Sequence, residues 1–473
     1  MSFELERLAA ACLFPGFAGL TPSDELRRWL ERGLGGVVIF ARNVRDREQV
    51  AALTGALRAE RPDLLVAIDE EGGDVTRLEA DSGSSYPGNH ALGAVDDVAL
   101  TEQVASAMGS DLADVGVNLD LAPVADVNSN PRNPVIGVRS FGAEADLVAR
   151  HVAAFVTGLQ GAGVAACAKH FPGHGDTEQD SHHELPVAAG PPDEALVPFR
   201  AAIDAGVRAV MTAHIRVPGL GEAPATLNRE ILNGLLRVGL GFRGLVVTDA
   251  LEMRAVSATV GVEEAAVRAL EAGADALCLG HDLGPGRVHR ALVGAVRSGR
   301  LEEDGLRKAA NCVGQTAAAA PATSVPAGRR EIGAVAARRA IETEGNPALS
   351  RPPLVVELAP EPSIAAGHAG RGLGESLRIR IPATKVIRLR DAPDDAARML
   401  EGHGGRQLVV AVRDAHRHPW QRAVAGSLFA AAADAVVVET GIPVWRPPET
   451  RFIATHGAGR VNLDAAADLL AGD

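Results

Sequence analysis

Cysteine is scarce in this sequence, and long apolar runs are missing. The four cysteines are Cys12, Cys167, Cys278 and Cys312. No two of them form a Cys-x-x-Cys pair, which argues against a zinc knuckle and a disulfide framework and favours free, buried thiols. No stretch reaches the roughly 18 apolar residues that a membrane span needs. The first residues include Glu4, Glu6 and Arg7, unlike a signal peptide, so we expect a soluble, cytoplasmic protein with no membrane partner.

Lysine and positive net charge are also lacking. The only lysines are Lys169, Lys308 and Lys385, so nearly every cationic side chain is an arginine. A position that keeps lysine therefore indicates a specific role more strongly than usual. The 60 Asp and Glu residues outnumber the 47 Lys and Arg residues, which gives a formal net charge of −13. Because a general nucleic-acid binder needs a basic surface, we expect no nucleic-acid partner. Hydrophobic residues make up 47% of the chain, which is ordinary for a globular protein with a sizeable core.

Short apolar segments alternate with amphipathic ones along residues 1–320. The expected strands are Val37–Phe40, Leu64–Ile68, Asn118–Ala122, Val164–Ala168, Ala209–Ala213, Gly244–Thr248 and Ala276–Leu279. The expected helices include Arg47–Arg58, Ala145–Gln160, Asp193–Ala205, Val262–Ala272 and Gly286–Ser298. Short apolar strands separated by helices favour parallel pairing. About seven or eight such units predict an α/β fold of the TIM-type (β/α)8 barrel class, with a doubly wound open sheet as the alternative.

A run rich in Ala, Pro and Ser, residues 316–330, interrupts this pattern and is typical of a linker. The strands expected after it are Leu354–Leu358, Leu408–Val412, Ala435–Val438 and Phe452–Thr455. A helix is expected near Asn462–Leu470. We therefore predict a barrel domain over residues 1–320, a linker over 321–350 and a smaller α/β domain over 351–473, of ordinary domain size.

Ionisable side chains follow the expected strands, at the ends where a parallel barrel carries its chemistry. They include Asp69, Glu70, Glu71, Arg77, Asp126, Lys169, His170, Asp180, His182, His214 and Asp249. A barrel with only a structural role has no need of this repeated pattern, so we expect a site at these strand ends. Lys169 and His170 are candidates for polar contacts with a substrate.

The densest group is the stretch 169–183, which holds four of the 14 histidines. Metal ligation is one interpretation, because His and Asp are natural zinc or iron ligands. Against it, Pro172, Gly173 and Gly175 break the segment, so no HxxxH or HExxH helix is present. Acid–base chemistry is the second: Asp180 lies two residues from His182, and on an irregular loop the carboxylate can fix the imidazole tautomer for proton transfer. A loop whose histidines only maintain its shape is the third. Spacing alone leaves all three open.

Asp249 directly follows the apolar segment 245–248. A carboxylate at this point faces the mouth of a barrel and can act as a nucleophile, a base or a ligand. It can equally cap a helix that starts at Ala250. The segment Glu71-Gly72-Gly73 lacks the GxGxxG pattern and the P-loop lysine, so nucleotide binding is disfavoured.

Five segments, in order, resemble one known family. Lys169-His170-Phe171-Pro172-Gly173-His174-Gly175-Asp176-Thr177, with Asp180-Ser181-His182 and Leu185-Pro186, resembles the signature of the bacterial β-N-acetylglucosaminidases of glycoside hydrolase family 3. The other four are Asp69 to Arg77, Asn133 to Phe141, Met211-Thr212-Ala213-His214, and Gly241 to Asp249. The resemblance covers residues 8–315. The last 120 or so residues more weakly resemble the α/β sandwich of two-domain members.

The resemblance implies retaining hydrolysis of terminal β-linked N-acetylglucosamine (GlcNAc) through a covalent glycosyl-enzyme, without metal or cofactor. It implies that Asp249 is the nucleophile and that His182, assisted by Asp180, is the acid/base. It further implies that the sugar is bound by Asp69, Arg77, Arg139, Lys169 and His170. To these candidate substrate-binding residues we add His214, because it also follows an expected strand.

Three alternatives remain beside this hydrolase. Retaining enzymes normally use two carboxylates about 5–5.5 Å apart, whereas a neutral Asp–His pair would let phosphate approach, so phosphorolysis on the same fold is the first alternative. The second is a metal-dependent barrel hydrolase that uses the histidines of 170–183. The third is a non-catalytic sugar-binding module, which has no need to keep Asp249, Asp180 and His182 together.

The sequence departs from the family at Glu70-Glu71-Gly72-Gly73-Asp74-Val75, where members usually show Gln-Glu-Gly-Gly-Arg-Val. Two positions are more acidic, so we expect altered electrostatics and a weaker preference for an anionic muramyl-type aglycone. Aromatic residues make up only 3% of the chain, which argues against a long polysaccharide groove. The expected partner is a small glycoside, such as a cell-wall turnover fragment or chitobiose.

Overall fold

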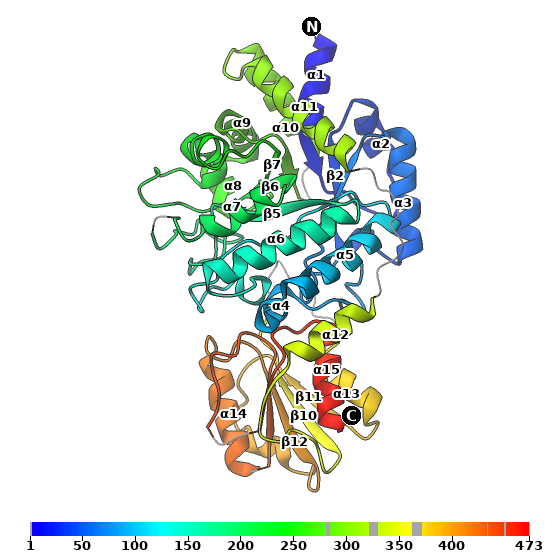
Figure 1. Ribbon diagram of the computed structural model, residues 1–473, viewed down its shortest axis with the longest axis vertical. Helices are drawn as coiled ribbons and strands as arrows, with labels where there is room; N and C mark the ends of the chain where they lie inside the picture. Colours follow the sequence, from blue (N-terminus) through cyan, green and yellow to red (C-terminus); the bar gives the residue numbers. More distant parts are fainter. Residues whose placement is uncertain are drawn as a thin grey trace. The chain divides into compact units, whose positions relative to one another are not determined.

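The computed structural model of this chain describes residues 2–190, 192–280, 284–320, 330–361, 371–432, 434–448 and 451–472. The chain forms two compact units, and many of their helices and strands are labelled in Figure 1. Unit 1 consists of Met1–Glu70, Val98–Ile136 and Ala143–Arg329. Unit 2 consists of Glu71–Asp97, Gly137–Gly142 and Arg330–Asp473, so it also contains two segments from the first third of the chain.

The strands of unit 1 form parallel sheets. They are β1 (Leu13–Pro15), β2 (Gly36–Ile39), β3 (Leu65–Ile68), β4 (Leu119–Asp120), β5 (Ala165–Phe171), β6 (Ala209–Thr212), β7 (Leu245–Thr248) and β8 (Leu277–Leu279). Strands β2 to β7 pair in chain order as one six-stranded sheet, and β1 pairs with β8. Single parallel bridges join Gly16 to Val38 and Val247 to Ala276. The predicted α/β class with a parallel sheet is confirmed, and a complete eight-stranded barrel stays a prediction.

Helices follow most strands of unit 1. They are α1 (Ser2–Ala11), α2 (Asp24–Glu31), α3 (Arg47–Glu60), α5 (Val98–Asp114), α6 (Ala145–Gly161), α7 (Leu196–Asp204), α8 (Arg254–Val260), α9 (Val262–Ala272), α10 (Pro285–Arg297) and α11 (Glu303–Ala319). Two 3₁₀ segments, η1 (Ala41–Asn43) and η3 (Ala225–Leu227), and a π-helix, η4 (Glu230–Gly239), complete the unit. Helices α5 and α6 pack side by side (Figure 1).

Alternate residues of the unit 1 strands fill one apolar core. They include Leu65, Ala67, Leu119, Leu121, Ala165, Cys167, Ala209, Met211, Leu245 and Val247. The residues between them, such as Val66, Val210 and Val246, are also buried. Because both faces of each strand are covered, the strands read as continuous apolar runs, which is why the sequence predicts them well. Cys12, Cys167 and Cys278 are free and buried as expected, whereas Cys312 is only half-buried.

Unit 2 contains a second sheet with one antiparallel edge. Its strands are β9 (Glu342–Glu344), β10 (Pro353–Leu358), β11 (Lys385–Leu389), β12 (Gln407–Val412), β13 (Val436–Glu439) and β14 (Arg451–Ala454). The strand order is β11-β10-β12-β13-β14-β9, and only the β14–β9 pair is antiparallel. The other elements are α4 (Asn89–Val95), η2 (Gly137–Arg139), α12 (Glu331–Ala340), α13 (Leu373–Arg380), η5 (Ala397–Leu400), α14 (Pro419–Ala431) and α15 (Arg460–Ala471).

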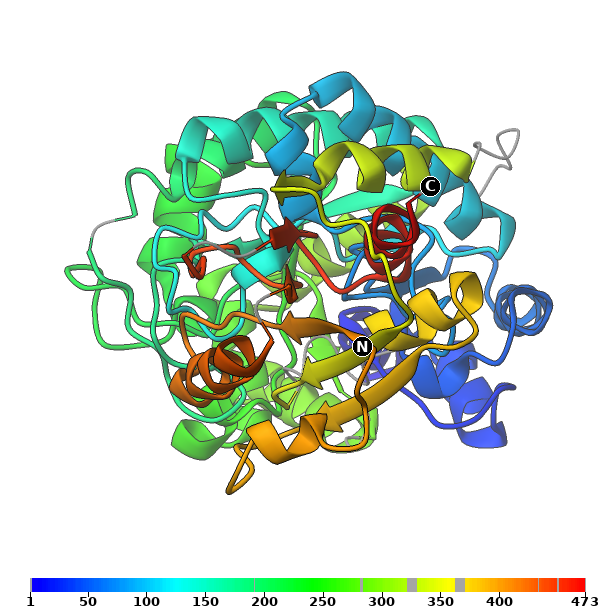
Figure 2. The same cartoon turned by 90° about the horizontal axis from the view of Figure 1, so that it is seen from below.

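Helices cover both faces of this second sheet. On one face, Val356 and Val410 pack in a cluster with Leu428 of α14. On the other face, alternate strand residues pack against α13 and α15, represented by Leu377 and Leu463. Figure 2 shows α14 on one side of the sheet and α13 and α15 on the other. Because successive side chains of a strand point to opposite faces of the sheet, the buried apolar strand residues pack in one or the other of these two clusters.

The region predicted as a linker is partly structured. Residues 330–350 include α12 and the edge strand β9, whereas residues 321–329 lie outside the described residues.

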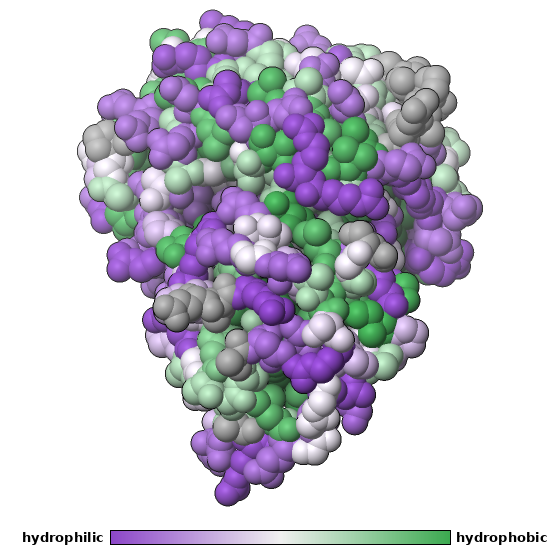
Figure 3. Space-filling model, turned by 60° about the horizontal axis from the view of Figure 1, so that its bottom comes forward, coloured by the Kyte–Doolittle hydropathy of each residue, from purple (hydrophilic) through white to green (hydrophobic). Residues whose placement is uncertain are grey.

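Figure 3 shows hydrophilic residues spread over one face of the molecule, with hydrophobic residues in separate groups between them. Among the described residues, no helix combines the length and hydrophobicity needed to cross a membrane.

Candidate active site

The carboxyl ends of the unit 1 strands bring together seven predicted site residues. They are Asp69, Lys169, His170, Asp180, His182, His214 and Asp249, whereas Arg77 and Arg139 belong to unit 2. Asp69 follows β3, and Lys169 lies near the end of β5. The Nζ atom of Lys169 is 2.8 Å from Oδ1 of Asp69, and the lysine is 1% exposed. Pairing offsets the cost of burying this ammonium group and fixes its position.

Asp126 accepts hydrogen bonds from the end of β5 and from the segment that follows it. Its Oδ2 atom accepts a hydrogen bond from Nδ1 of His170 at 2.7 Å, and Oδ1 accepts the backbone N–H of His174 at 2.7 Å. Burial would raise the pKa of Asp126, but the charge and hydrogen bond of His170 lower it. A carboxylate only accepts hydrogen bonds, so His170 carries a proton on Nδ1. Asp126 was not among the predicted site residues, although its position after an expected strand was a signal.

The dyad predicted from the sequence is formed in the structure. Oδ1 of Asp180 accepts hydrogen bonds from Nδ1 of His182 at 2.7 Å and from the backbone N–H of His182 at 2.9 Å. Burial opposes ionisation of Asp180, but these hydrogen bonds lower its pKa. Because Asp180 accepts the Nδ1 proton, Nε2 is the atom of His182 that can exchange protons with a ligand. The side chain of His182 is 22% exposed, which leaves it accessible.

Asp249 directly follows β7. Its Oδ1 atom accepts the backbone N–H of Ala250 at 2.8 Å. Burial would raise the pKa of Asp249, but the nearby imidazoles of His214 and His170 lower it. His182 acts on the Asp249 carboxylate in the same direction, so the dyad and this carboxylate are within electrostatic reach of each other. The site thus pairs an ionised carboxylate with a separate proton-transfer group.

His214 lies beside the Asp249 carboxylate, in the wall of the candidate site. Its Nε2 atom is 3.0 Å from the carbonyl oxygen of Ala250, and Nδ1 is 2.8 Å from Oγ1 of Thr226. Burial lowers the pKa of His214. Protein groups engage both ring nitrogens, an arrangement that fixes the turn at Ala250 next to Asp249. A direct contact of His214 with the substrate stays a prediction.

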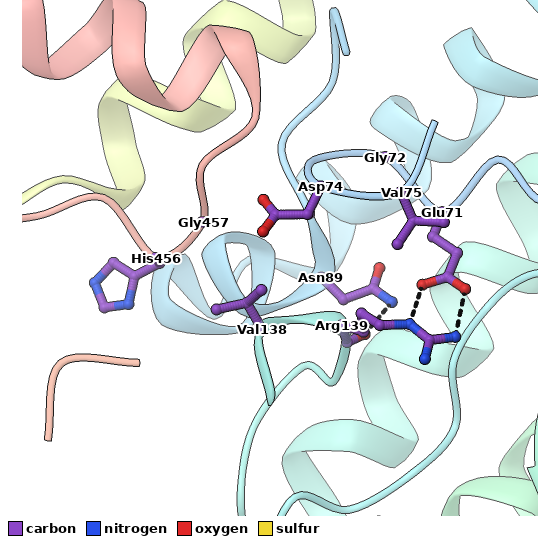
Figure 4. A pocket seen from close by; sticks show the side chains of 10 residues that line it. Glu71, Gly72, Asp74, Val75, Asn89, Val138, Arg139, His456 and Gly457 are labelled. Carbon is purple, nitrogen blue, oxygen red and sulfur yellow. Dashed lines mark hydrogen bonds and ion pairs between the residues drawn. The ribbon is translucent and has the colours of Figure 1, made fainter. Parts of the chain in front are cut away.

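Arg139 forms a buried, bidentate ion pair within unit 2. Its Nε and Nη2 atoms lie 2.9 and 2.8 Å from the two carboxylate oxygens of Glu71. The Nδ2 atom of Asn89 donates to the carbonyl oxygen of Arg139 at 2.7 Å (Figure 4). These residues line a cavity of about 10 Å³, room for about one water molecule. Arg77 is half-buried in the same unit, and its predicted contact with the sugar stays untested.

The acidic departure at Asp74 is neutralised within unit 2. Its carboxylate forms an ion pair with Arg413, which follows β12, and Oδ1 accepts the backbone N–H of Ala458 at 2.7 Å. Burial opposes the charge on Arg413, but Asp74 and Asp414 raise its pKa. The sequence predicted altered electrostatics from the two more acidic positions here. The negative charge of Asp74 is paired with Arg413, and its contacts connect the segment 71–97 to the C-terminal part of the chain.

The metal interpretation finds no ligand cluster. Within the part of the chain that the structure describes, no three His, Cys, Asp or Glu side chains group as a metal ion requires. In the stretch 169–183, the side chains of His170 and His182 are instead each hydrogen-bonded to an aspartate. The geometry favours the acid–base interpretation of this stretch.

The chain is similar to known proteins of one family. A sequence model of the glycosyl hydrolase family 3 N-terminal domain matches residues 5–315. The β-hexosaminidase A of Pseudoalteromonas piscicida is 40% identical over 283 residues, which cover 54% of this chain and 47% of that relative, about half its length. A β-hexosaminidase of Stenotrophomonas maltophilia is 36% identical over 316 residues, which cover 62% of this chain and 93% of that protein.

A solved structure is similar over nearly the whole chain. It is a glycoside hydrolase family 3 β-N-acetylglucosaminidase from Paenibacillus sp., 35% identical, with a TM-score of 0.88. The match covers 99% of this chain and 96% of that structure. With the family domain matched over residues 5–315 and the strand-end site in place, the chain belongs to glycosyl hydrolase family 3 and is a glycoside hydrolase.

Proposed function

We propose that this enzyme is a retaining exo-β-N-acetylglucosaminidase that removes terminal β-linked GlcNAc from small glycosides. The observation that carries the proposal is that Asp249 follows β7, while the segment of the Asp180–His182 dyad is hydrogen-bonded to Ala255, six residues after Asp249. The lowered pKa of Asp249 agrees with this role. The names of the relatives support the same sugar, since they are β-hexosaminidases and a β-N-acetylglucosaminidase. We extend the proposal to a complete (β/α)8 barrel, a cytoplasmic location and substrates derived from cell walls or chitin.

In the first step, a carboxylate oxygen of Asp249 attacks the anomeric carbon, and the bond to the leaving oxygen breaks. The protonated His182 transfers its Nε2 proton to that oxygen, so the aglycone leaves as a neutral alcohol. Asp180 holds the Nδ1 proton at 2.7 Å, which stabilises the imidazolium before the transfer and orients the ring during it. The products of this step are the free aglycone and a glycosyl ester of Asp249.

In the second step, the now neutral Nε2 of His182 accepts a proton from water as the water oxygen attacks the anomeric carbon. The ester bond to Asp249 breaks, and GlcNAc leaves with the β configuration restored. The lowered pKa of Asp249 suits both steps, because the residue must be ionised to attack and must leave as an anion. His182 returns to its protonated form and is ready for the next cycle.

Sugar binding is assigned to groups whose positions are already fixed by ion pairs. Lys169 is held by Asp69, and His170 is held by Asp126, so both can contact hydroxyl groups without first being ordered. Arg77 and Arg139 remain proposed sugar contacts from unit 2. Fixed polar groups of this kind are what an exo-acting site needs to orient a single sugar ring.

Phosphorolysis is the second candidate, and one feature favours it. The imidazole of His182 carries no negative charge after the first step, so an anionic nucleophile would approach it without the repulsion that a carboxylate base would cause. Hydrolysis and phosphorolysis share the glycosyl ester on Asp249. They differ only in the nucleophile of the second step, so their products distinguish them.

One assay tests the proposal. The enzyme is incubated with an aryl β-N-acetylglucosaminide and a chelator, with and without inorganic phosphate, and the sugar product is identified by NMR spectroscopy. We expect free GlcNAc, formed first as the β anomer, at a rate that the chelator does not change. GlcNAc 1-phosphate as the main product would favour the phosphorylase. A chelator-sensitive rate restored by a metal ion would contradict both, and an α-configured first product would contradict retention.

A further inference from the structure

The proposed acid/base dyad lies on an irregular loop between β5 and α7. The contact between Asp180 and His182 spans only two residues, so it fixes the imidazole relative to its own loop. It does not fix the loop relative to Asp249, which follows a different strand. A proton-transfer group must be held within hydrogen-bond reach of the reacting oxygen. Another contact must therefore fasten the loop to the rest of unit 1.

Ser181, between the two members of the dyad, is that point of attachment. It is 3% exposed, and its hydroxyl oxygen lies 3.3 Å from Nε2 of His174. Its carbonyl oxygen accepts the backbone N–H of Ala255 at 3.3 Å. Ala255 belongs to α8, the helix that follows Asp249. Ser181 thus connects the segment of the dyad to His174, an earlier residue of the same loop, and to the segment after the proposed nucleophile.

Both ring nitrogens of His174 contact hydroxyl groups. Nδ1 lies 2.7 Å from Oγ1 of Thr177, and Nε2 lies 3.3 Å from the hydroxyl oxygen of Ser181. The Thr177 hydroxyl also lies 3.0 Å from the carbonyl oxygen of His174. A hydroxyl group can donate or accept, so the contact with Ser181 can form with either neutral tautomer of the ring.

The backbone of His174 is fixed at both ends of the residue. Its N–H donates to Oδ1 of Asp126 at 2.7 Å, and its carbonyl oxygen accepts from Nδ2 of Asn133 at 2.7 Å. The ring is 2% exposed. The next residue, Gly175, packs so closely that a Cβ atom there would lie 1.9 Å from the carbonyl oxygen of Val127. His174 is therefore a rigid support, and Ser181 is the residue that it supports.

We infer that His174 is a positioning residue for acid/base catalysis: through Ser181 it holds the Asp180–His182 dyad at the distance from Asp249 that proton transfer needs. This inference rests on the proposed function. It assigns a task to a buried histidine that none of the steps above uses. The two ring nitrogens of His174 contact Thr177 and Ser181, and Ser181 lies between the two members of the dyad.

Two variants of His174 separate the two contacts of its ring. In His174→Gln, the longer side chain places an amide group near the position of Nε2 and can again hydrogen-bond to Ser181. In His174→Asn, the shorter side chain reaches only towards Thr177. We expect His174→Asn to lose about 10-fold or more in kcat/KM on an unactivated substrate such as chitobiose, and His174→Gln to recover most of that loss.

The measurement is the ratio of kcat/KM for a 2,4-dinitrophenyl glycoside to kcat/KM for the unactivated substrate. The dinitrophenolate leaves with little acid assistance, so a misplaced acid changes kcat/KM for this substrate only slightly. The expected signature of His174→Asn is a ratio that rises about 10-fold, in the same direction as in His182→Ala. Equal losses on both substrates, or a wild-type ratio, would overturn the inference. Ser181→Ala is the second variant, and it should raise the ratio even if a His174 variant fails to fold.

A matched control is His151→Ala in α6. His151 is also fully buried, and its Nδ1 atom is 2.8 Å from a threonine hydroxyl, that of Thr101. Its loss should lower stability but leave the substrate ratio unchanged. If the proposed function itself is wrong, His182→Ala will also leave the ratio of the two kcat/KM values unchanged. A changed ratio in His182→Ala with an unchanged ratio in Ser181→Ala and His174→Asn contradicts only the inference about His174.

Discussion

Nδ1 of His182 donates to Oδ1 of Asp180 at 2.7 Å, and this contact fixes which nitrogen of the imidazole can exchange protons. Retaining glycosidases normally perform this exchange with a second carboxyl group. In the proposed mechanism a histidine takes its place, and a carboxylate from the same loop holds its tautomer. Proton transfer then depends on this pair and on its electrostatic relation to Asp249.

Loss of the proposed acid should depend on the leaving group. In His182→Ala we expect kcat/KM for an unactivated glycoside to fall about 10²- to 10⁴-fold. The loss on a 2,4-dinitrophenyl glycoside should be at least 10-fold smaller, because this leaving group departs without a proton. Steady-state kinetics on the two substrates check this expectation. Equal losses would show that His182 has a structural role only.

Lys169 and Lys308 form a natural pair for comparison, because each is one of only three lysines. Lys169 is buried against Asp69, whereas Lys308 is exposed on α11. We expect Lys169→Ala to lower kcat/KM about 10- to 100-fold, as when a hydrogen bond to a charged group worth about 1.5–3 kcal/mol is lost. Lys308→Ala should leave it unchanged. Similar values for the two variants would contradict the sugar-binding role of Lys169.

The buried carboxylate of Asp126 should make stability depend on pH. Its pKa is lower in the folded chain than in the unfolded chain, where it is about 3.9. The ionised group therefore stabilises the fold above that value, and this contribution is lost as pH falls through the folded pKa.

We accordingly expect Asp126→Asn to lower the free energy of unfolding at pH 7 by more than it does at pH 3. Denaturant unfolding at the two values measures the difference. Glu222→Gln, which changes an exposed carboxylate, is the control and should show no such difference. A pH-independent effect of Asp126→Asn would indicate that its carboxylate is not ionised in the folded state.

The ion pair of Asp74 with Arg413 should stabilise unit 2. Breaking a buried pair costs about 3–5 kcal/mol, and the Arg413 side chain is 26% exposed, so we expect a smaller cost. Asp74→Ala and Arg413→Ala should each lower the free energy of unfolding by about 2–3 kcal/mol, and the double variant by less than their sum.

An exposed pair provides the control for this measurement. Arg132 and Glu178 form an ion pair with side chains 73% and 54% exposed. Arg132→Ala should change the free energy of unfolding by less than about 1 kcal/mol. Additive effects of the Asp74 and Arg413 substitutions in denaturant unfolding would mean that the two residues contribute independently and that the pair is not the stabilising feature.

The strands of unit 1 were predictable because they are buried on both faces and read as apolar runs. Helix Val262–Ala272 was predicted with its exact bounds, since Gly273 ends it with a positive φ of 118°. Strand β1 was missed because it is short and ends in Pro15, a residue that argues against a strand. Strand β11, at a sheet edge, was missed because its residues are exposed or only half-buried.

The site was predictable where its contacts are local. Asp180 and His182 are two residues apart, so the sequence alone suggested their pairing. The contact between Asp126 and His170 spans 44 residues and requires the segment after β4 to meet the end of β5, which spacing does not reveal. The assignment of Arg139 to unit 2 and the pairing of Asp74 with Arg413 depend on tertiary packing and could not be predicted from the order of motifs.

The central claim is that Asp249 forms a glycosyl ester, and trapping this ester tests it most directly. The enzyme is incubated with an activated 5-fluoro-β-N-acetylglucosaminide, which slows the second step, and is then digested and analysed by peptide mass spectrometry. The account predicts one sugar per chain, attached to the peptide that contains Asp249, and no labelling of Asp249→Asn. A label on another carboxylate, or full turnover by Asp249→Asn, would contradict it.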